Sequence, residues 1–432
     1  MSTVSSAPPP GTPVPAVGGT RTVPAPDAIA RDYLLLGLRL DQRIPGLVDG
    51  YFGPADLKAQ VDMEQPSTPA RLREDAVALR ARLPAEVEAP DRRAWLEAQL
   101  VALETHASIL AGEELPYLEY VARCFGYAPP RHPDAEFEDA ADALDQLLPG
   151  SGSLTVRLDA WDAQFGIARD QVADVARWLA ERFRARASAL FGMPEAEDLR
   201  ISVVTGQPWS AYNWYDGGRR SRVDINSDLP NRAPELVNLM AHGAYPGHHL
   251  EHAWKEADLV DRAGRLESSI LLINTPECLI SEGLANLGRL FAVQADEHAG
   301  LLVELFERAG LQLARDPAAA SEAAERSISL AGHRQTLSAI RGNAAIHRHA
   351  DGWSHEQVET YLRDVGRYAA TVAAKRLEFI EHPLWRTYVF VYAEGETLLG
   401  RWLEAVPEPE RVARFGRLLH EQLTPDAVRS PG

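Results

Sequence analysis

The 432-residue sequence has only two cysteines, Cys124 and Cys278, and they lie far apart in the chain. Neither has a neighbouring cysteine at metal-ligand spacing, so the sequence excludes a disulfide framework and a zinc finger built on cysteine ligands. We expect each cysteine to be a small buried hydrophobic residue. Such cysteine usage is typical of a reducing compartment, and we predict a cytoplasmic protein.

Long hydrophobic runs are also absent. No stretch approaches the roughly 18 apolar residues of a membrane-spanning helix, so we expect no membrane partner. Residues 1–26 are rich in Pro, Gly, Ser and Thr and carry almost no charge. They have neither the basic start nor the apolar centre of a signal peptide, so we predict a disordered tail over 1–26.

The sequence has fewer basic residues than acidic residues. The 44 Lys and Arg residues face 62 Asp and Glu residues, which gives a net charge of -18. Because phosphate groups are bound by concentrated Lys and Arg, we expect no nucleic-acid partner. The sequence also lacks a Gly-x-Ser-x-Gly elbow and a glycine-rich phosphate loop, which excludes α/β-hydrolase, kinase and dinucleotide-dehydrogenase chemistry.

What the sequence does contain is a large number of amphipathic helical patterns. Hydrophobic residues make up 45% and charged residues 25%, which are ordinary values for a folded globular protein. We predict a mainly α protein with a single helical body over 27–425, divided into 27–198, 199–228 and 229–425. The predicted helices are 27–44, 68–83, 91–112, 133–148, 166–191, 277–309, 317–341, 355–362, 365–380 and 384–405.

A small β element interrupts the helices. The segments 201–205, 210–214 and 222–226 are rich in β-branched and aromatic residues, and Gly-containing turns separate them. We predict a hairpin or meander near the histidine-rich segment that follows. It acts either as a structural cap or as a strand edge that binds an extended peptide by main-chain pairing.

Three histidines crowd the segment Ala241-His242-Gly243-Ala244-Tyr245-Pro246-Gly247-His248-His249. On a straight helix, residues six apart differ by about 240° and 9 Å, too far to share one ion. Pro246 disfavours helical geometry at Tyr245 and Gly247 accepts unusual dihedrals, so the chain can loop back and return a second histidine to the first. We predict a metal site with ligands His242 and His248, with His249 as the competing second ligand.

A catalytic zinc ion takes three protein ligands and keeps one position open. Glu282, in Ser281-Glu282-Gly283-Leu284-Ala285, supplies a carboxylate at a suitable distance along the chain. We therefore predict Zn²⁺ held by His242, His248 and Glu282. Glu251 and Glu277 are candidates for orienting the ligands or for acid–base chemistry.

Other polar residues are weaker candidates. Tyr388, Tyr392 and His333 could reach over a metal cleft to stabilise an oxyanion or donate a proton, although tyrosines at helical spacing are common in cores. Three arginines after the Asp-Gly-Gly turn could read a substrate carboxylate, or could simply form a solvated hairpin end; these are Arg219, Arg220 and Arg222.

The string from Leu236 to Glu251, followed by 281–285, resembles the DUF885 family of bacterial zinc-peptidase-like proteins. The usual string of that family is His-Glu-Ala-Tyr-Pro-Gly-His-His. The segments 48–54 and 388–395 also resemble the family, so the resemblance spans most of the chain after the tail. It implies a gluzincin-like, metallopeptidase-like helical fold, zinc at His242, His248 and Glu282, and hydrolysis of peptide or amide bonds.

Gly243 is the departure from that pattern, because it occupies the position of the family's general base. A positioned general base typically contributes about 10²–10⁴ in rate. We therefore predict a zinc-dependent hydrolase-like protein with altered or weakened chemistry on a peptide or other small carbonyl-containing substrate, helped by Glu251, His249 and Tyr392. The alternative is a catalytically silent zinc-binding protein that acts as a binder or scaffold.

Overall fold

The protein, described by a computed structural model over residues 26–207 and 209–429, is mainly helical, as predicted. All but the last residue of the expected tail, 1–26, lies outside the described residues. The helices before the three-stranded sheet are α1 (Ala28–Asp41), α2 (Ala55–Met63), α3 (Pro69–Glu86), α4 (Pro90–Leu110), α5 (Tyr117–Phe125), α6 (Asp134–Leu147), α7 (Leu154–Ala163) and α8 (Arg169–Phe191).

The helices after the sheet include those that carry the histidine-rich segment and Glu282. They are α9 (Ala233–Gly243), α10 (His248–Lys255), α11 (Pro276–Leu287), α12 (Arg289–Ala292), α13 (His298–Arg308), α14 (Pro317–Ser338), α15 (Ile340–His349), α16 (His355–Asp364), α17 (Ala370–Glu381), α18 (Trp385–Tyr388), α19 (Val391–Glu404), α20 (Glu408–His420) and α21 (Pro425–Arg429). A π-helix, η1 (Glu256–Arg262), and two 3-10 helices, η2 (Leu266–Ser269) and η3 (Gln312–Arg315), complete the helical set of the described residues.

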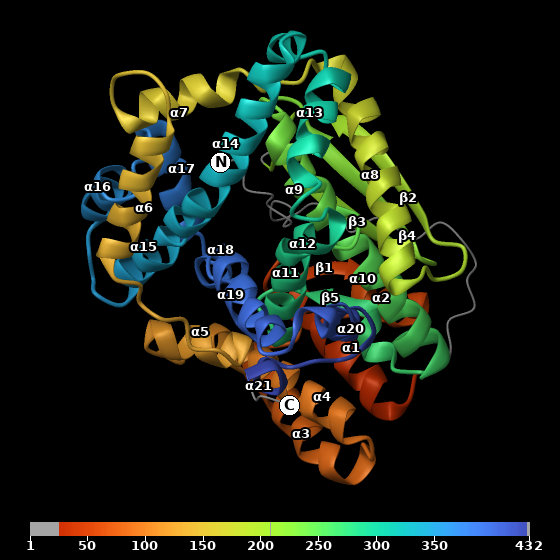
Figure 1. The fold of residues 1–432 in the computed structure, drawn as a ribbon. Coiled ribbons are helices and arrows are strands. Elements are labelled where there is room, and N and C mark those ends of the chain that lie inside the picture. Colours follow the sequence, from red (N-terminus) through yellow and green to blue (C-terminus); the bar gives the residue numbers. More distant parts are fainter. Residues whose placement is uncertain (1–25, 208, 430–432) are drawn as a thin grey trace.

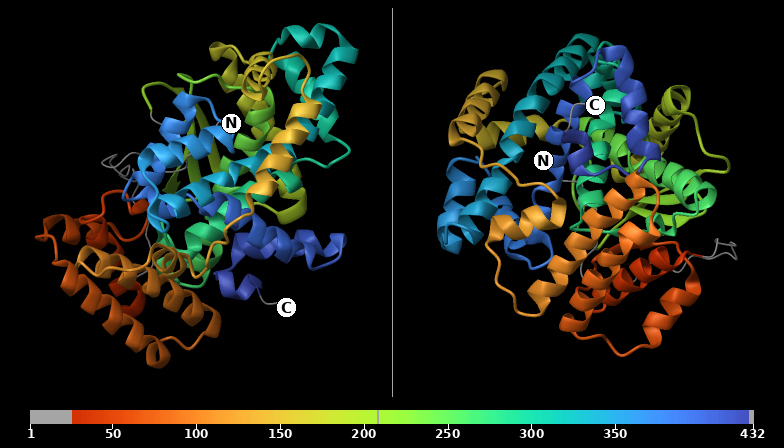
Figure 2. Two further views of the ribbon diagram at one scale, coloured as in Figure 1. Left: turned by 90° about the vertical axis from the view of Figure 1, so that its left-hand side faces the viewer. Right: turned by 90° about the horizontal axis from the view of Figure 1, so that it is seen from below.

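The helices form layers around a central pair. In Figure 1, α1, α3 and α4 lie at one end of the molecule, and α6 lies beside α14 to α17 on one side. The two views of Figure 2 show the red and orange N-terminal helices as a separate layer. Helices α11 and α19 pack against each other in the middle, so segments distant in sequence meet there.

Local sequence explains where several helices begin. The Asp27 side chain accepts a hydrogen bond from Ala30 N at 2.7 Å, which caps α1. Thr275 caps α11 in the same way, and Pro276 occupies its first turn. These caps fix the start of the helix that carries Glu282.

The β element contains the predicted hairpin but not a meander. Strand β4 (Arg220–Asn226) lies between β3 (Ala211–Gly217), to which it is antiparallel, and β2 (Asp198–Val204), to which it is parallel. Positive φ angles at Gly217, Gly218 and Arg219 make the tight turn between β3 and β4. The meander is wrong because β2 pairs with β4 and not with β3, the next strand in the chain, and strand propensity does not encode this non-local contact.

A second sheet was missed. Strand β1 (Val48–Tyr51) pairs antiparallel with β5 (Ile270–Leu272), and the sequence predicted neither strand. The long helices predicted over 277–309, 317–341 and 384–405 are also wrong as single helices, because each is interrupted in the structure. The pairing of β1 with β5 joins residues more than 200 positions apart, which local periodicity does not report.

Candidate metal centre

The three predicted ligands come together from three helices. His242 lies in the last turn of α9, His248 is the first residue of α10, and Glu282 lies within α11. Nε2 of His242 is 3.4 Å from Glu282 Oε2, and Nε2 of His248 is 3.7 Å from Glu282 Oε1. Two ligand atoms on a tetrahedral zinc lie roughly 3.3 Å apart. The donor set and its spacing therefore fit a zinc ion.

The Pro-Gly turn makes this convergence possible. Helix α9 ends at Gly243, and α10 begins at His248 after a short connection. Gly247 N donates to Ala241 O at 3.0 Å, which folds the chain back onto the end of α9. A Cβ atom on Gly247 would lie 1.8 Å from the carbonyl oxygen of His242. Only glycine fits this close approach of backbone to backbone.

Each histidine is oriented through its other ring nitrogen. Nδ1 of His242 lies 3.0 Å from Asn286 Oδ1, and Asn286 Nδ2 donates to the Tyr392 carbonyl at 3.1 Å. Nδ1 of His248 lies 3.2 Å from Ser281 Oγ. Among the described residues, the buried Nε2 atoms of both histidines have no hydrogen-bond partner. Burying a polar atom without a partner costs free energy, and a cation bound by both atoms offsets that cost.

Glu282 is held in position by contacts from α18 and α19. Tyr388 Oη donates to Glu282 Oε1 at 2.6 Å. Helices α11 and α19 approach so closely at Gly283 that an added Cβ would lie 2.4 Å from Gly395 O. This contact fixes the backbone beside Glu282, so the carboxylate is positioned before any ion binds.

Glu251 supports His248. Its Oε1 accepts from Lys255 Nζ at 2.7 Å and its Oε2 accepts from Ser281 Oγ at 2.6 Å. His252 completes a second group that could hold a metal, with His248 and Glu251. The Lys255 ammonium beside Glu251 disfavours a cation there, so the group of His242, His248 and Glu282 is the better centre.

The two ligand histidines differ in their electrostatics. Burial, and after it the charge of the neighbouring His248, lower the pKa of His242 to about 4, so His242 is neutral. Burial also opposes the charge of His248, but the carboxylates of Glu282 and Glu251 outweigh it and raise the pKa of His248 to about 10. A metal ligand must be deprotonated, so zinc binding should release a proton from His248.

The structure does not bring His249 to the metal centre. Its Nδ1 lies 2.8 Å from Ser221 Oγ and its Nε2 lies 2.9 Å from Glu197 Oε2. Glu197 Oε2 also accepts from Tyr245 Oη at 2.7 Å, and Arg184 pairs with the other carboxylate oxygen. Both ring nitrogens of His249 are thus engaged away from the group of His242, His248 and Glu282. His249 anchors the connection between α9 and α10 to the sheet.

The contact between His249 and Glu197 should make the unfolding free energy depend on pH. Burial opposes ionisation of Glu197, but hydrogen bonds from His249, Tyr245 and Arg184 lower its pKa from 4.5 to about 2. A lowered carboxyl pKa stabilises the fold above pH 4.5, and this stability is lost as the pH falls toward 2. In chelator-treated protein, we expect Glu197→Gln to remove about 2–3 kcal/mol of the difference in unfolding free energy between pH 5.5 and 2. Urea unfolding at both pH values measures it, and equal differences for the two proteins would contradict the assignment.

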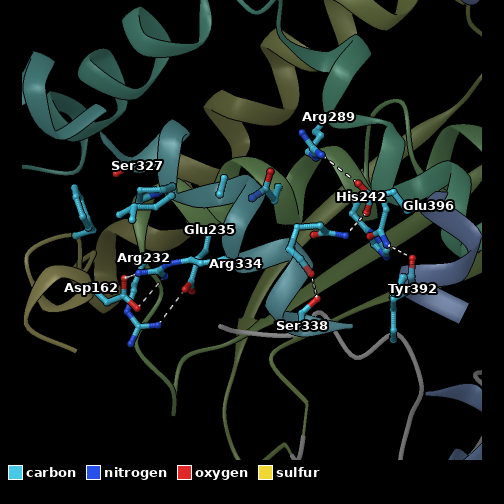
Figure 3. Close-up of a pocket in the computed structure, with 18 of the residues that line it drawn as sticks. Asp162, Arg232, Glu235, His242, Arg289, Ser327, Arg334, Ser338, Tyr392 and Glu396 are labelled. Atoms are coloured by element: carbon cyan, nitrogen blue, oxygen red, sulfur yellow. Dashed lines mark hydrogen bonds and ion pairs between the residues drawn. The ribbon is translucent and has the colours of Figure 1, made fainter. Parts of the chain in front are cut away.

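Two cavities border the candidate metal centre. His242 lines the larger one, of about 230 Å³, with Asn286 and Tyr392. Figure 3 shows His242 and Tyr392 at one end of this cavity and Asp162, Arg232 and Arg334 at the other. His248 and Glu282 line a smaller cavity of about 70 Å³. A ligand at the ion could extend into the larger space.

Asp49 is a residue of this site that sequence reasoning missed. It lies on β1, lines the smaller cavity with His248 and Glu282, and accepts a hydrogen bond from Tyr212 Oη. The pKa of Asp49 is raised to about 7, mainly by burial and partly by Glu282, against the opposing effects of the Tyr212 hydrogen bond and His248. The only signal in the sequence was a lone Asp within the apolar segment 48–52.

Of the remaining candidates, two line a cavity and one does not. Tyr392 lines the larger cavity, with its ring centroid 6.4 Å from that of His242. Glu277 lines the smaller cavity, where Trp95 Nε1 donates to its Oε2 at 2.7 Å and Lys255 pairs with its other oxygen. His333 lines neither cavity.

Strand β3 of the hairpin lines the smaller cavity through one residue, whereas the arginines of the hairpin do not line it. Asn213 lines the smaller cavity and donates from Nδ2 to the Gly243 carbonyl at 2.5 Å. Arg219 pairs with Asp261, and neither it nor Arg222 lines the two cavities. The sheet therefore acts as a cover over Gly243 from the side of β3.

Comparisons with known proteins show a similarity of fold only. No protein-family model and no curated protein matches the chain. A solved structure described as a "putative lipoprotein" from Colwellia psychrerythraea is similar with a TM-score of 0.50 and 15% identity, over 83% of this chain and 65% of that one. One from Shewanella oneidensis, a "putative lipoprotein of unknown function", has a TM-score of 0.46 and 13% identity, over 86% of this chain and 74% of that one.

This chain thus spans about 65% of the length of the Colwellia protein, and the likeness between the two is one of fold. Within residues 26–207 and 209–429, no helix combines the length and the apolar character that a membrane crossing requires.

Proposed function

We propose that this protein is a zinc-dependent hydrolase of metallopeptidase-like fold that acts on the amide bond of a peptide or other small substrate. One observation carries the proposal. The Nε2 atoms of His242 and His248 are buried without a hydrogen-bond partner among the described residues, and both face the Glu282 carboxylate. Two histidines and one carboxylate are a common donor set of catalytic zinc. The resemblance of the surrounding motif to the DUF885 family supports the same function.

Zinc held there would polarise a carbonyl group and lower the pKa of water. Gly243 has no side chain to move a proton, and both oxygens of Glu251 are already engaged by Lys255 and Ser281. Asp49 remains in the smaller cavity beside His248. Its pKa near 7 suits a group that accepts and returns a proton at neutral pH. We therefore assign proton transfer to Asp49.

The function is tested by metal removal together with one variant. Purified protein should bind one zinc ion and hydrolyse members of a library of N-acyl amino acids and dipeptides. Chelation should abolish turnover, and added zinc should restore it. We expect Asp49→Asn to keep its zinc but to lower kcat/KM by about 10²–10⁴, since only the proton acceptor is lost. Mass-spectrometric metal analysis and steady-state kinetics give the two readouts.

A catalytically silent binder is the second candidate, and Gly243 favours it. A Cβ at Gly243 would meet only the Val223 methyl groups, at 3.8 and 3.9 Å, so a side chain can start there. Stoichiometric zinc without turnover in wild type, with turnover gained in Gly243→Glu, would favour the binder. Absence of zinc from protein refolded with excess zinc would overturn both candidates.

A further inference from the structure

The larger cavity has more positive than negative charge in a strongly acidic protein. Three of its arginines each pair with an acid that also lines the cavity; the pairs are Arg232 with Glu235, Arg289 with Glu396, and Arg334 with Asp162. Arg341 is the remaining charged residue of the cavity wall. The chain as a whole carries a net charge of -18, so an uncompensated cation in the cavity beside His242 is unexpected.

Arg341 is positioned as an anion ligand. Its side chain is 9% exposed, and its Nε donates to the Ser338 carbonyl at 3.0 Å. Among the described residues, Arg341 forms no ion pair, and its two terminal nitrogens donate no hydrogen bond. A guanidinium in this state presents a rigid fork that matches a carboxylate. Burying a charge without a partner costs free energy, and a bound anion would offset that cost.

A second cation lies near Arg341. Burial, and to a smaller extent the charge of Arg341, lower the pKa of Arg376 to about 10, so the two guanidinium groups lie within electrostatic reach of each other. The wall of the larger cavity also has an apolar part, formed by Trp161, Phe165 and Leu330. The wall thus combines an anion-binding end with an apolar surface and the ligand His242.

We propose that Arg341 binds the free carboxylate of the substrate, so that the site takes N-acyl amino acids or short peptides through their carboxyl end. An apolar side chain of the substrate would lie against Trp161 and Phe165, and its amide carbonyl would face His242. This inference deepens the proposed function and rests on it for the reacting group. The binding of the carboxylate itself does not require the metal.

The test uses one pair of probes on the full-length, chelator-treated protein. N-acetyl-L-leucine and its neutral analogue N-acetyl-L-leucinamide differ only at the group that Arg341 would bind. We expect the wild type to bind the acid at least about 10-fold more tightly than the amide in ligand-observed NMR titrations, because the charge-assisted hydrogen bonds form only with the acid. Arg341→Gln should remove this preference, and Arg341→Lys should keep part of it.

Arg363→Gln is the matched control, since it removes the same charge from an exposed residue outside the cavity. It should leave the preference unchanged. Equal binding of acid and amide by the wild type would overturn the proposal even if Arg341→Gln fails to fold. So would a preference that survives in folded Arg341→Gln. Zinc content and turnover are measured separately on untreated and zinc-supplemented protein, so an acid preference in a protein that takes up no zinc and shows no turnover would contradict the proposed function alone.

Discussion

Gly247→Ala is expected to destabilise the protein by at least about 4 kcal/mol, or to prevent it from folding. The added Cβ would lie 1.8 Å from His242 O and 2.5 Å from Ala241 O. Both atoms belong to the backbone at the end of α9, so no side-chain rotation can relieve the overlap. The connection would have to open, and His248 would move away from His242. Urea unfolding of the purified variant measures the loss.

Gly243→Ala is the matched control, only four residues away. Its Cβ would make ordinary contacts with Val223 at 3.8 and 3.9 Å, in the last turn of α9. Alanine favours a helix over glycine by up to about 1 kcal/mol, so this variant should be as stable as the wild type or slightly more stable. Equal losses in the two variants would mean that the close approach at Gly247 is not what holds the two histidines together.

His242→Ala is expected to weaken zinc binding by more than about 100-fold, a larger loss than the 10–100-fold typical of residues that only orient a ligand. Asn286→Ala, which removes the partner of His242 Nδ1, should fall within that smaller range. Competition with a chromophoric chelator at pH 7.5 gives the dissociation constants.

His252→Ala distinguishes the two groups that could hold a metal. His252 belongs to the group with His248 and Glu251 but not to the group with His242 and Glu282. We expect His252→Ala to change zinc affinity by less than 10-fold, because its ring contacts the rings of His248 and Tyr215 without belonging to the favoured ligand group. A large loss in His252→Ala with little loss in His242→Ala would assign the metal to the other group.

Much of the fold was accessible from local sequence. Helices such as α1, α4 and α6 agree with their predicted ranges because their apolar faces repeat at the helical period and their ends carry Pro or capping residues. The pairing of β1 with β5, and of β2 with β4, was not accessible. Those contacts depend on how distant segments pack, and a strand of three or four residues leaves little local signal.

Part of the candidate site could likewise be predicted from the local sequence, and part of it could not. The spacing of His242, Pro246-Gly247 and His248 encodes the return of the chain, so the ligand pair could be predicted before the structure. Asp49 and Arg341 could not, because one lies on an unpredicted strand and the other on α15, almost 100 residues after His242. Their importance comes from the cavities they line, which the packing of the helices creates.

Crystals grown with zinc and measured at the zinc absorption edge test the central claim most directly. The account predicts one anomalous peak, about 2.0–2.2 Å from His242 Nε2, His248 Nε2 and a carboxylate oxygen of Glu282. A peak among His248, Glu251 and His252, or no peak in the presence of excess zinc, would contradict it.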